Sequence, residues 1–332
     1  MLVIGGAGFA AIVAADAPNT PTANPSTLEV SITDGAGTAN ATYAVNKSSG
    51  TINITNGSLT NQVVASIDPA TESGKAIQFA VDNATETNDT VRVGSGIYNG
   101  SIDITTAGVT LESANSAETI LNVTDSGSEP VADIEASNVT VAGFTIERVD
   151  GDAYSQAIAV RATDNVTLYN NTLSQSGGTA PTQGVLITDN SGDQANNTNT
   201  NITDIESKGF SHGVAVSTQD QNSGGIDNAT VTASTLESNT IGVKISDFPD
   251  TNESINVNIN DNEIVDNGDG IRVLNTSAGP NGTDPKGVAE LNNVIVTNNN
   301  LSTNSRFGIN NSGIGDKINA TRNWWGAADG PG

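Results

Sequence analysis

The sequence predicts an all-β fold, a parallel β-helix in which each coil contributes three short strands. A segment that begins with Asn and alternates apolar with polar residues recurs along the C-terminal two thirds of the chain, and a period of this length is typical of solenoids. The spacing of two places one row of side chains inside a strand and one row outside. After Asn138 no stretch keeps the three-and-four spacing of a helical repeat. The clear copies are NVTVAGFTI, NVTLYNNTL, NATVTASTL, NVNINDNEI and NVIVTNNNL, from Asn138, Asn165, Asn228, Asn256 and Asn293, with weaker copies from Asn201 and Asn319.

A second short signature follows each copy. It reads AIAV, GVLI, GVAV, GVKI, GIRV and FGIN, from Ala157, Gly184, Gly213, Gly242, Gly270 and Phe307. Each repeat therefore has room for three strands, for example Val139–Val141, Phe144–Ile146 and Ala157–Val160. Gly, Asn and Asp between the strands suit sharp turns, because these residues tolerate left-handed backbone conformations. Roughly nine coils, about 4.8 Å apart, would form a rod on the order of 45 Å long.

Asn residues recur at matching turn positions in successive copies. Stacked Asn side chains can form hydrogen bonds from one coil to the next, as they do in cross-β stacks. We therefore expect a structural ladder here, rather than ligand binding. Its expected members are Asn170, Asn171, Asn262, Asn299 and Asn300.

The chain divides into three parts. Residues 1–15 are apolar and end in small residues, as an export signal does, although no Lys or Arg precedes Leu2. Either the natural start lies upstream or this segment has another role. Residues 16–68 are expected to form a mobile linker and N-terminal strands, and residues 69–332 a single β-helix domain. Within Ser73–Ala84, helical spacing predicts an amphipathic helix that covers the open first coil, or else an isolated surface helix.

The motifs AIQFAVDNA, DTVRVGSGIY and GVTL, followed by the repeats and by NWWG with GPG, resemble a known superfamily. These are the right-handed parallel β-helix proteins of the pectin-lyase-like superfamily, in its NosD-like and surface-protein branches. The resemblance covers about residues 70–332. It implies a right-handed coil and a fold that includes polysaccharide lyases and hydrolases, but one fold hosts many activities.

The amino-acid composition indicates the environment in which the protein is expected to work. The chain has 37 acidic and 12 basic residues, a formal net charge of −25, and no cysteine. This charge excludes nucleic acid as a natural partner and is screened in concentrated salt, so the protein is similar to those of extreme halophiles. A merely acidic extracellular protein is the alternative. We expect secretion or cell-surface location, no membrane span in the mature chain, no disulfides, and N-glycans at the loop sequons of Asn275 and Asn281.

Candidate catalytic residues are few. Arg272 lies beside Asp266 and Asp269 in DNGDGIRV, the one coil in which acidic and basic side chains are expected close together. A lyase needs a base near its substrate's carboxylate, and a glycosidase needs two or three converging carboxylates. His212, the sole histidine, would need a carboxylate from a neighbouring coil, at Asp189 or Glu237. The order of motifs found in polygalacturonases is absent.

Few residues suggest a metal or a ligand. No cofactor is expected beyond weak Ca²⁺ binding in the turns between Asp261 and Asp269, which ordinary turn chemistry also explains. Trp324 and Trp325 are adjacent, so one should point inward and one outward. They either close the C-terminal end or provide a platform for carbohydrate stacking. The two longest insertions, within Ser174–Thr200 and at Asn275–Glu290, are either binding loops or neutral surface loops.

The sequence favours a non-catalytic, exported surface glycoprotein, a β-helix rod with a structural role or a role in binding carbohydrate or other surface proteins. The alternative is a polysaccharide lyase or glycoside hydrolase that acts on an acidic polysaccharide. A carboxylate–arginine cluster in the folded chain would favour the enzyme.

Overall fold

The structure is a computed structural model. It describes residues 25–34, 39–56, 62–84, 89–116, 118–123, 129–149, 155–177, 182–189, 196–218, 224–247, 255–275, 293–312 and 318–327. The expected leader at residues 1–15, the glycosylation candidate Asn281 and most of the insertion at Asn275–Glu290 lie outside these residues, as do residues 178–181 and 190–195 of the other insertion. Of Asn275 only the backbone is described.

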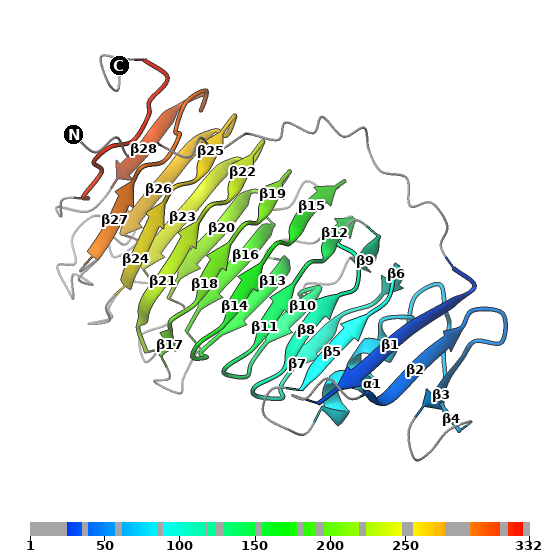
Figure 1. Ribbon diagram of the computed structural model, residues 1–332. Helices are drawn as coiled ribbons and strands as arrows, with labels where there is room; N and C mark the ends of the chain where they lie inside the picture. Colours follow the sequence, from blue (N-terminus) through cyan, green and yellow to red (C-terminus); the bar gives the residue numbers. More distant parts are fainter. Residues whose placement is uncertain are drawn as a thin grey trace, which may run out of the picture.

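The described strands form three long sheets that run the length of the molecule (Figure 1). Sheet A contains β1 Thr27–Thr33, β2 Ala39–Asn46, β3 Thr51–Asn56, β4 Val63–Ser66, β5 Thr90–Val93, β8 Thr110–Ser113, β11 Thr140–Ala142, β14 Thr167–Tyr169, β17 Asn197–Thr198, β18 Asn201–Thr203, β21 Ile226–Thr232, β24 Ile255–Asn260 and β27 Asn293–Thr297. Sheet B contains β6 Gly96–Asn99, β9 Thr119–Val123, β12 Thr145–Val149, β15 Thr172–Ser176, β19 Glu206–Lys208, β22 Thr235–Glu237 and β25 Glu263–Val265. Sheet C contains β7 Ile102–Ile104, β10 Ala132–Ile134, β13 Gln156–Arg161, β16 Gln183–Thr188, β20 His212–Ser217, β23 Ile241–Asp247, β26 Asp269–Asn275 and β28 Phe307–Ser312.

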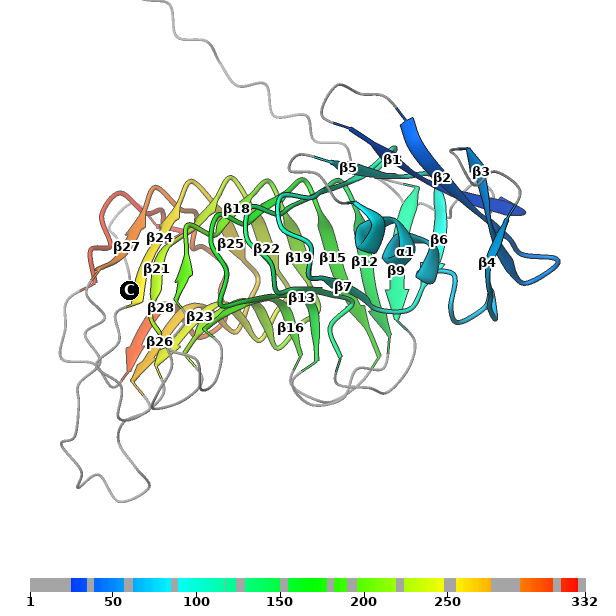
Figure 2. The ribbon, with the colours of Figure 1, turned by 90° about the horizontal axis from the view of Figure 1, so that it is seen from below.

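The chain passes from sheet A to sheet B to sheet C and then starts the next coil, so successive coils pair in parallel (Figure 2). This confirms the all-β parallel solenoid with three strands per coil. The shortest sheet has seven strands, and the expected count of roughly nine coils is not confirmed. The right hand of the coil stays a prediction.

The core is a set of aliphatic columns that run along the coil axis. In sheet A one inward position of every coil aligns in register, and each of its side chains is fully buried. The column consists of Val91, Leu111, Val141, Leu168, Ile202, Val231, Ile259 and Val296. Burial stabilises each such side chain by about 1.5–3 kcal/mol relative to exposure, and only a stacked neighbour provides that burial.

Buried Asn side chains form ladders at the two turns that flank sheet B. In the first ladder each side chain accepts a backbone N–H of the preceding coil. Its members are Asn171, Asn262, Asn299 and Asn323, and Ser234 Oγ accepts the N–H of Ile205 at the equivalent position. In the second, Asn239, Asn267 and Asn304 do the same. The predicted ladder is confirmed for Asn171, Asn262 and Asn299. Asn300 also bonds from coil to coil, but to the carboxylate of Glu263 and not to another Asn, and the ladder role of Asn170, a left-handed turn residue, stays a prediction.

A third, exposed ladder explains why the repeat begins with Asn. Amide groups bond from coil to coil through Asn138, Asn165, Asn199 and Asn228, at 2.7–3.1 Å. All four have φ between 54° and 60°, a left-handed conformation that Asn tolerates. The repeat anchor of this coil is therefore Asn199, and not Asn201 as the sequence motif suggested.

The second signature marks a column of glycines where sheet C begins. A Cβ on Gly213 would lie 2.8 Å from the carbonyl oxygen of Gly242, and one on Gly242 would lie 2.6 Å from that of Gly270. The same holds for Gly184 and Gly270. None of these four glycines is among the residues with positive φ, so their role differs from that of the glycines in the turns between strands. Glycine is required because adjacent coils approach too closely for a side chain.

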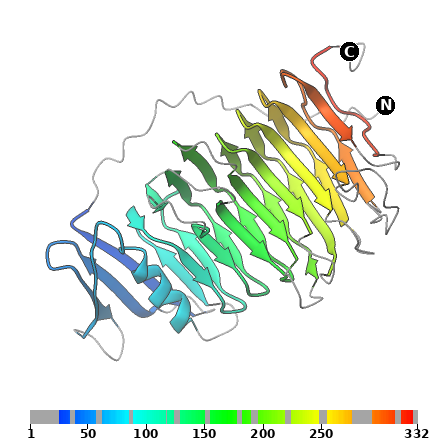
Figure 3. The same cartoon turned by 180° about the vertical axis from the view of Figure 1, so that it is seen from behind.

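At the N-terminal end, strands β1–β4 are antiparallel and extend sheet A beyond β5 through the β1–β5 pairing. The one described helix, α1 Lys75–Asn83, lies beside these strands (Figure 3). It buries Ala76, Ile77, Ala80 and Val81, and Phe79 stacks on Tyr43 of β2 with ring centroids 6.5 Å apart. The predicted amphipathic helix therefore exists.

Candidate functional site

The outer face of sheet C gathers cations toward the C-terminal end. Because Ile271 and Val273 point into the core, Arg272 between them points outward. Lys244 is the direct neighbour of Arg272 on β23, and Asn310 is its neighbour on β28. Two like charges in adjacent positions repel each other, so this pairing is unfavourable by itself.

Asp269 is the centre of the cluster. Its side chain is fully buried and forms ion pairs with both Arg272 and Arg306. Its Oδ2 accepts hydrogen bonds from Arg272 and, at 3.2 Å, from the amide of Asn310. Its Oδ1 receives no hydrogen bond of good geometry, although Nε of Arg306 lies 3.0 Å away. Asp269 thus holds two guanidinium groups in place.

His212 begins β20, in the same register row as Ile241 and Asp269. Burial, reinforced by the positive charges of Lys244 and Arg272, lowers its pKa from 6.5 to about 4. Its Nδ1 is buried and has no hydrogen-bond partner among the described residues. His212 is therefore a neutral imidazole at pH 7.

Lys244 shares this environment. Burial and the neighbouring Arg272 lower the pKa of its ammonium group. Ala215 and Ile241, the register neighbours of Lys244 and His212, are buried although they lie outside the central core, so water is scarce around both basic groups. Within the described segments no carboxylate pairs with Lys244. The cluster therefore contains three cations, Lys244, Arg272 and Arg306, against the single carboxylate of Asp269.

The predicted site residues are only partly brought together. Asp269 and Arg272 are ion-paired, and the repeat places His212 in the same register row as Asp269. Asp266 instead occupies an exposed left-handed turn (φ 55°), where its N–H donates to Thr303 Oγ1. The charges that act on the pKa of His212 are those of Lys244 and Arg272, and a carboxylate partner at Asp189 or Glu237 stays a prediction.

Sequence reasoning missed Lys244, Arg306 and Asn310. The alignment of GVKI with GIRV contained the signal, because it places Lys244 and Arg272 at the same position of consecutive coils. Arg306 directly precedes the FGIN signature, and Asn310 is its last residue.

The tryptophan pair splits as alternation predicts. Trp325 packs against the end of the core and against Gly308, where a Cβ would lie 2.9 Å from its ring. Trp324 points outward and is 50% exposed. Trp325 therefore contributes to the end of the core, and only Trp324 is available to a ligand.

No group of three or more His, Cys, Asp or Glu side chains suited to a metal ion occurs in the part of the chain that the structure describes. The weak Ca²⁺ site between Asp261 and Asp269 stays a prediction. Within the same residues, no helix is long and apolar enough to cross a membrane.

Fold and site together define a parallel β-solenoid with a cation–carboxylate cluster on one outer face. Neither a protein-family model nor a curated protein sequence matches the chain. Among solved structures, it is similar to the A-module of the Azotobacter vinelandii mannuronan C-5 epimerase AlgE4, with 15% identity, a TM-score of 0.40, and coverage of 72% of this chain and 70% of that one. ORF18 of Geobacillus virus E2 shows 13% identity, a TM-score of 0.39, and coverage of 84% and 67%.

A Paenibacillus alginate lyase shows 11% identity and a TM-score of 0.29, with coverage of 72% of this chain and 98% of that one. All three TM-scores lie below 0.5. The description of the fold therefore rests on the strand pairing given above.

Proposed function

We propose that the protein acts on an acidic polysaccharide, and that the cation cluster on sheet C binds the carboxylate of a uronic acid unit. The observation that carries this proposal is the pairing of Lys244 with Arg272 in a chain of net charge −25. An anion placed between the two cations relieves their repulsion, and it does so in a partly buried site where the attraction is strong. Arg306, half exposed and anchored by Asp269, extends the positive surface.

The reaction that fits these residues best is elimination by a lyase. Hydrolysis of a glycosidic bond needs two carboxylates, whereas the cluster offers one, and that one is engaged by two arginines. Elimination needs a base in its proton-accepting form, and the imidazole of His212 is in that form at pH 7 because its pKa is about 4. The imidazole takes the proton from the ring carbon next to the carboxylate. The C–H electrons form a double bond, and the C–O bond to the next sugar breaks. The departing oxygen takes a proton from water, and the imidazolium of His212 returns its proton to the solvent.

The test is turnover of polymannuronate, polyguluronate and polygalacturonate in concentrated salt, followed through the ultraviolet absorbance of the new double bond. We expect His212→Gln to lower kcat by at least about 100-fold. Gln occupies the same register position in the two preceding coils, at Gln156 and Gln183, so the variant should fold. Arg272→Ala should raise KM.

Arg161→Ala is the matched control, since Arg161 lies on the same face but is paired with Asp133 at 2.7 Å. It should leave both constants unchanged. Turnover that survives in His212→Gln would exclude His212 as the base. A protein that neither binds nor cleaves any of the three polymers would refute the assignment of the substrate class.

A non-catalytic rod is the second candidate. The observation in its favour is that both oxygens of Asp269 face arginines, so the cluster can hold an anion without any proton transfer. Saturable binding of a polyuronate without an ultraviolet product, weakened by Arg272→Ala and not by His212→Gln, would establish this role.

The setting and the finer architecture are also proposals. We propose an exported protein at the cell surface, adapted to concentrated salt by its acidic surface, with glycans at Asn275 and Asn281. We also propose that α1 covers the first coil of a right-handed stack of roughly nine coils. The buried face of α1 supports this, because the end of a solenoid exposes apolar side chains.

A further inference from the structure

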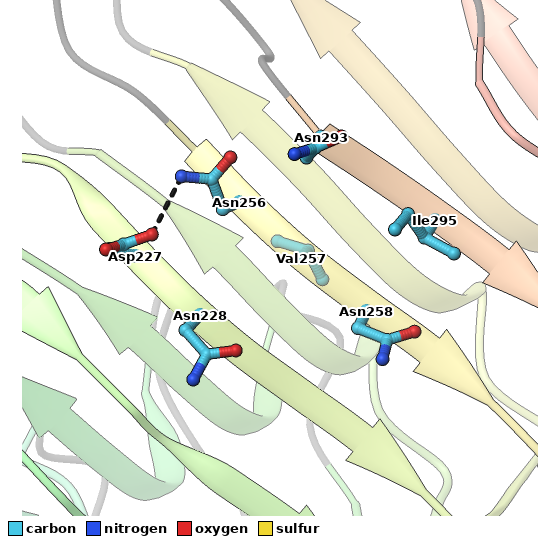
Figure 4. A pocket seen from close by; sticks show the side chains of 7 residues that line it. All are labelled: Asp227, Asn228, Asn256, Val257, Asn258, Asn293 and Ile295. Atoms are coloured by element: carbon cyan, nitrogen blue, oxygen red, sulfur yellow. Dashed lines mark hydrogen bonds between the residues drawn. The ribbon is translucent and has the colours of Figure 1, made fainter.

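A hollow of about 310 Å³ opens on the outer face of sheet A, far along the coils from the N-terminal strands (Figure 4). Its origin is an irregularity in strand register. Between Ile226 and Ala229 strand β21 has one residue more than the matching stretch of β24, from Ile255 to Val257. The exposed Asn ladder ends here, at Asn228. In the next coil the matching stretch belongs to the single strand β24. A bulge of this kind re-aims side chains and often adjoins a binding site.

The hollow is lined mainly by amides. The Nδ2 of Asn256 donates to Oδ1 of Asp227 at 2.8 Å, as the dashed line in Figure 4 shows. Asn258 lies on the next outward position of β24, and its Oδ1 is buried without a hydrogen-bond partner in the described structure. A buried acceptor without a partner costs about 1–3 kcal/mol, so this oxygen favours a ligand that brings a donor. Asn228, Val257, Asn293 and Ile295 complete the lining.

A second hollow, of about 340 Å³, lies where the same two strands end. The half-exposed Trp324 forms part of its wall, together with Asp261, Glu263 and Arg322. Asn293 begins β27 and Asn298, which lines the second hollow, directly follows it. From Asn293 to Asn298 the two hollows together extend over about 16 Å of strand, the length of a short oligosaccharide.

The outward positions of β24 and β27, in the first hollow and between the two hollows, are uncharged. They are Asn256, Asn258 and Asn260 on β24 and Ile295 and Thr297 on β27. Amides offer a donor and an acceptor on one side chain, which matches the donor-and-acceptor character of a sugar hydroxyl. An indole face packs on the apolar face of a sugar ring.

We propose that the outer face of β24 and β27, from the Asn258 hollow to Trp324, binds a neutral oligosaccharide. The ligand is neutral because three carboxylates line the two hollows, those of Asp227, Asp261 and Glu263, against the single cation of Arg322. A uronate chain would be repelled here. The site lies on a different sheet from the cation cluster, so this proposal does not depend on the proposed polysaccharide chemistry.

The test uses tryptophan fluorescence, because Trp324 and Trp325 are the only tryptophans in the chain. The probes are hexasaccharides of glucose and of mannose, with hexagalacturonate as the charged counterpart. We expect saturable binding of at least one neutral hexasaccharide and none of hexagalacturonate at the same concentration. Asn258→Ala should weaken binding about tenfold, because one or two hydrogen bonds are lost.

Trp324→Ala should also weaken binding about tenfold, as followed by calorimetry. Asn201→Ala and Tyr169→Ala are the matched controls, an exposed amide and a 48% exposed aromatic on the same face of sheet A. Both should bind as the wild-type protein does, and so should His212→Gln. Equal binding of hexagalacturonate, binding that is unchanged in either test variant, or no binding of any neutral hexasaccharide would each overturn the proposal.

Discussion

Replacement of Asn262 by Ala tests whether the buried ladder holds the coils together. The Oδ1 of Asn262 accepts the N–H of Ser234 at 3.0 Å, and its Nδ2 donates to the carbonyl of Val231 and to Oδ1 of Asn299, both at 2.9 Å. Alanine removes all three hydrogen bonds and leaves a buried N–H without its acceptor. At about 1 kcal/mol for each bond and about 1 kcal/mol more for the stranded donor, the expected loss is about 4 kcal/mol.

The assay is denaturant unfolding together with hydrogen exchange at the Ser234 amide, since a solenoid can open locally. Asn201→Ala is the control, because this exposed amide makes only one contact, at 3.4 Å, and its loss should stay within about 0.5 kcal/mol. Asn262→Asp keeps the acceptor but loses both donations and buries a charge, so it should be at least as damaging as alanine. If Asn262→Ala lies within about 1 kcal/mol of the control and Ser234 stays protected, the ladder is not a source of stability.

Three further predictions concern single positions. Gly242→Ala should cost about 1–3 kcal/mol in denaturant unfolding, because its Cβ would lie 2.6 Å from the Gly270 carbonyl; a loss below about 0.5 kcal/mol would contradict the close approach. The free energy of unfolding should fall by up to about 3 kcal/mol as pH drops from 6.5 to 4, because in this range His212 binds a proton in the unfolded chain but stays neutral in the folded one. The difference between wild type and His212→Gln isolates this effect, and parallel curves for the two would refute it. Trp325→Ala should cost about 3 kcal/mol and Trp324→Ala less than about 1 kcal/mol in thermal unfolding; equal losses would contradict their opposite orientations.

Local features of the repeat could be predicted because they follow from a single coil. Alternating burial in NVNIN and NVIVT, for example, requires only a strand with one face against the core. The buried ladder at Asn262 and Asn299 also follows from recurrence at one turn position. The exact position of the repeat anchor in this coil was harder to predict. Asn199 and Asn201 are both Asn, and only the left-handed backbone at Asn199 distinguishes them.

The cation cluster could not be predicted in the same way, because it depends on register between coils of different length. His212 and Asp269 are separated by more than fifty positions, yet share a register row through Ile241. Asp266 and Asp269 are close in sequence, but a turn separates an exposed carboxylate from a buried one. Proximity in sequence was therefore a poor guide, and the equivalent position in the next coil was the better one.

The glycine column sets the unit by which this chain can be lengthened or shortened. Each of these glycines faces the carbonyl of the equivalent glycine in the next coil. The corner at which the chain enters sheet C is therefore interchangeable between coils. Excision of the segment from Gly213 to Ile241 would join Ser211-His212 directly to Gly242 and recreate the same corner. A deletion that moves one of these glycines out of the column would place a side chain against a carbonyl. Modular change by whole coils is therefore open to this protein, whereas small deletions that shift the glycine position are not.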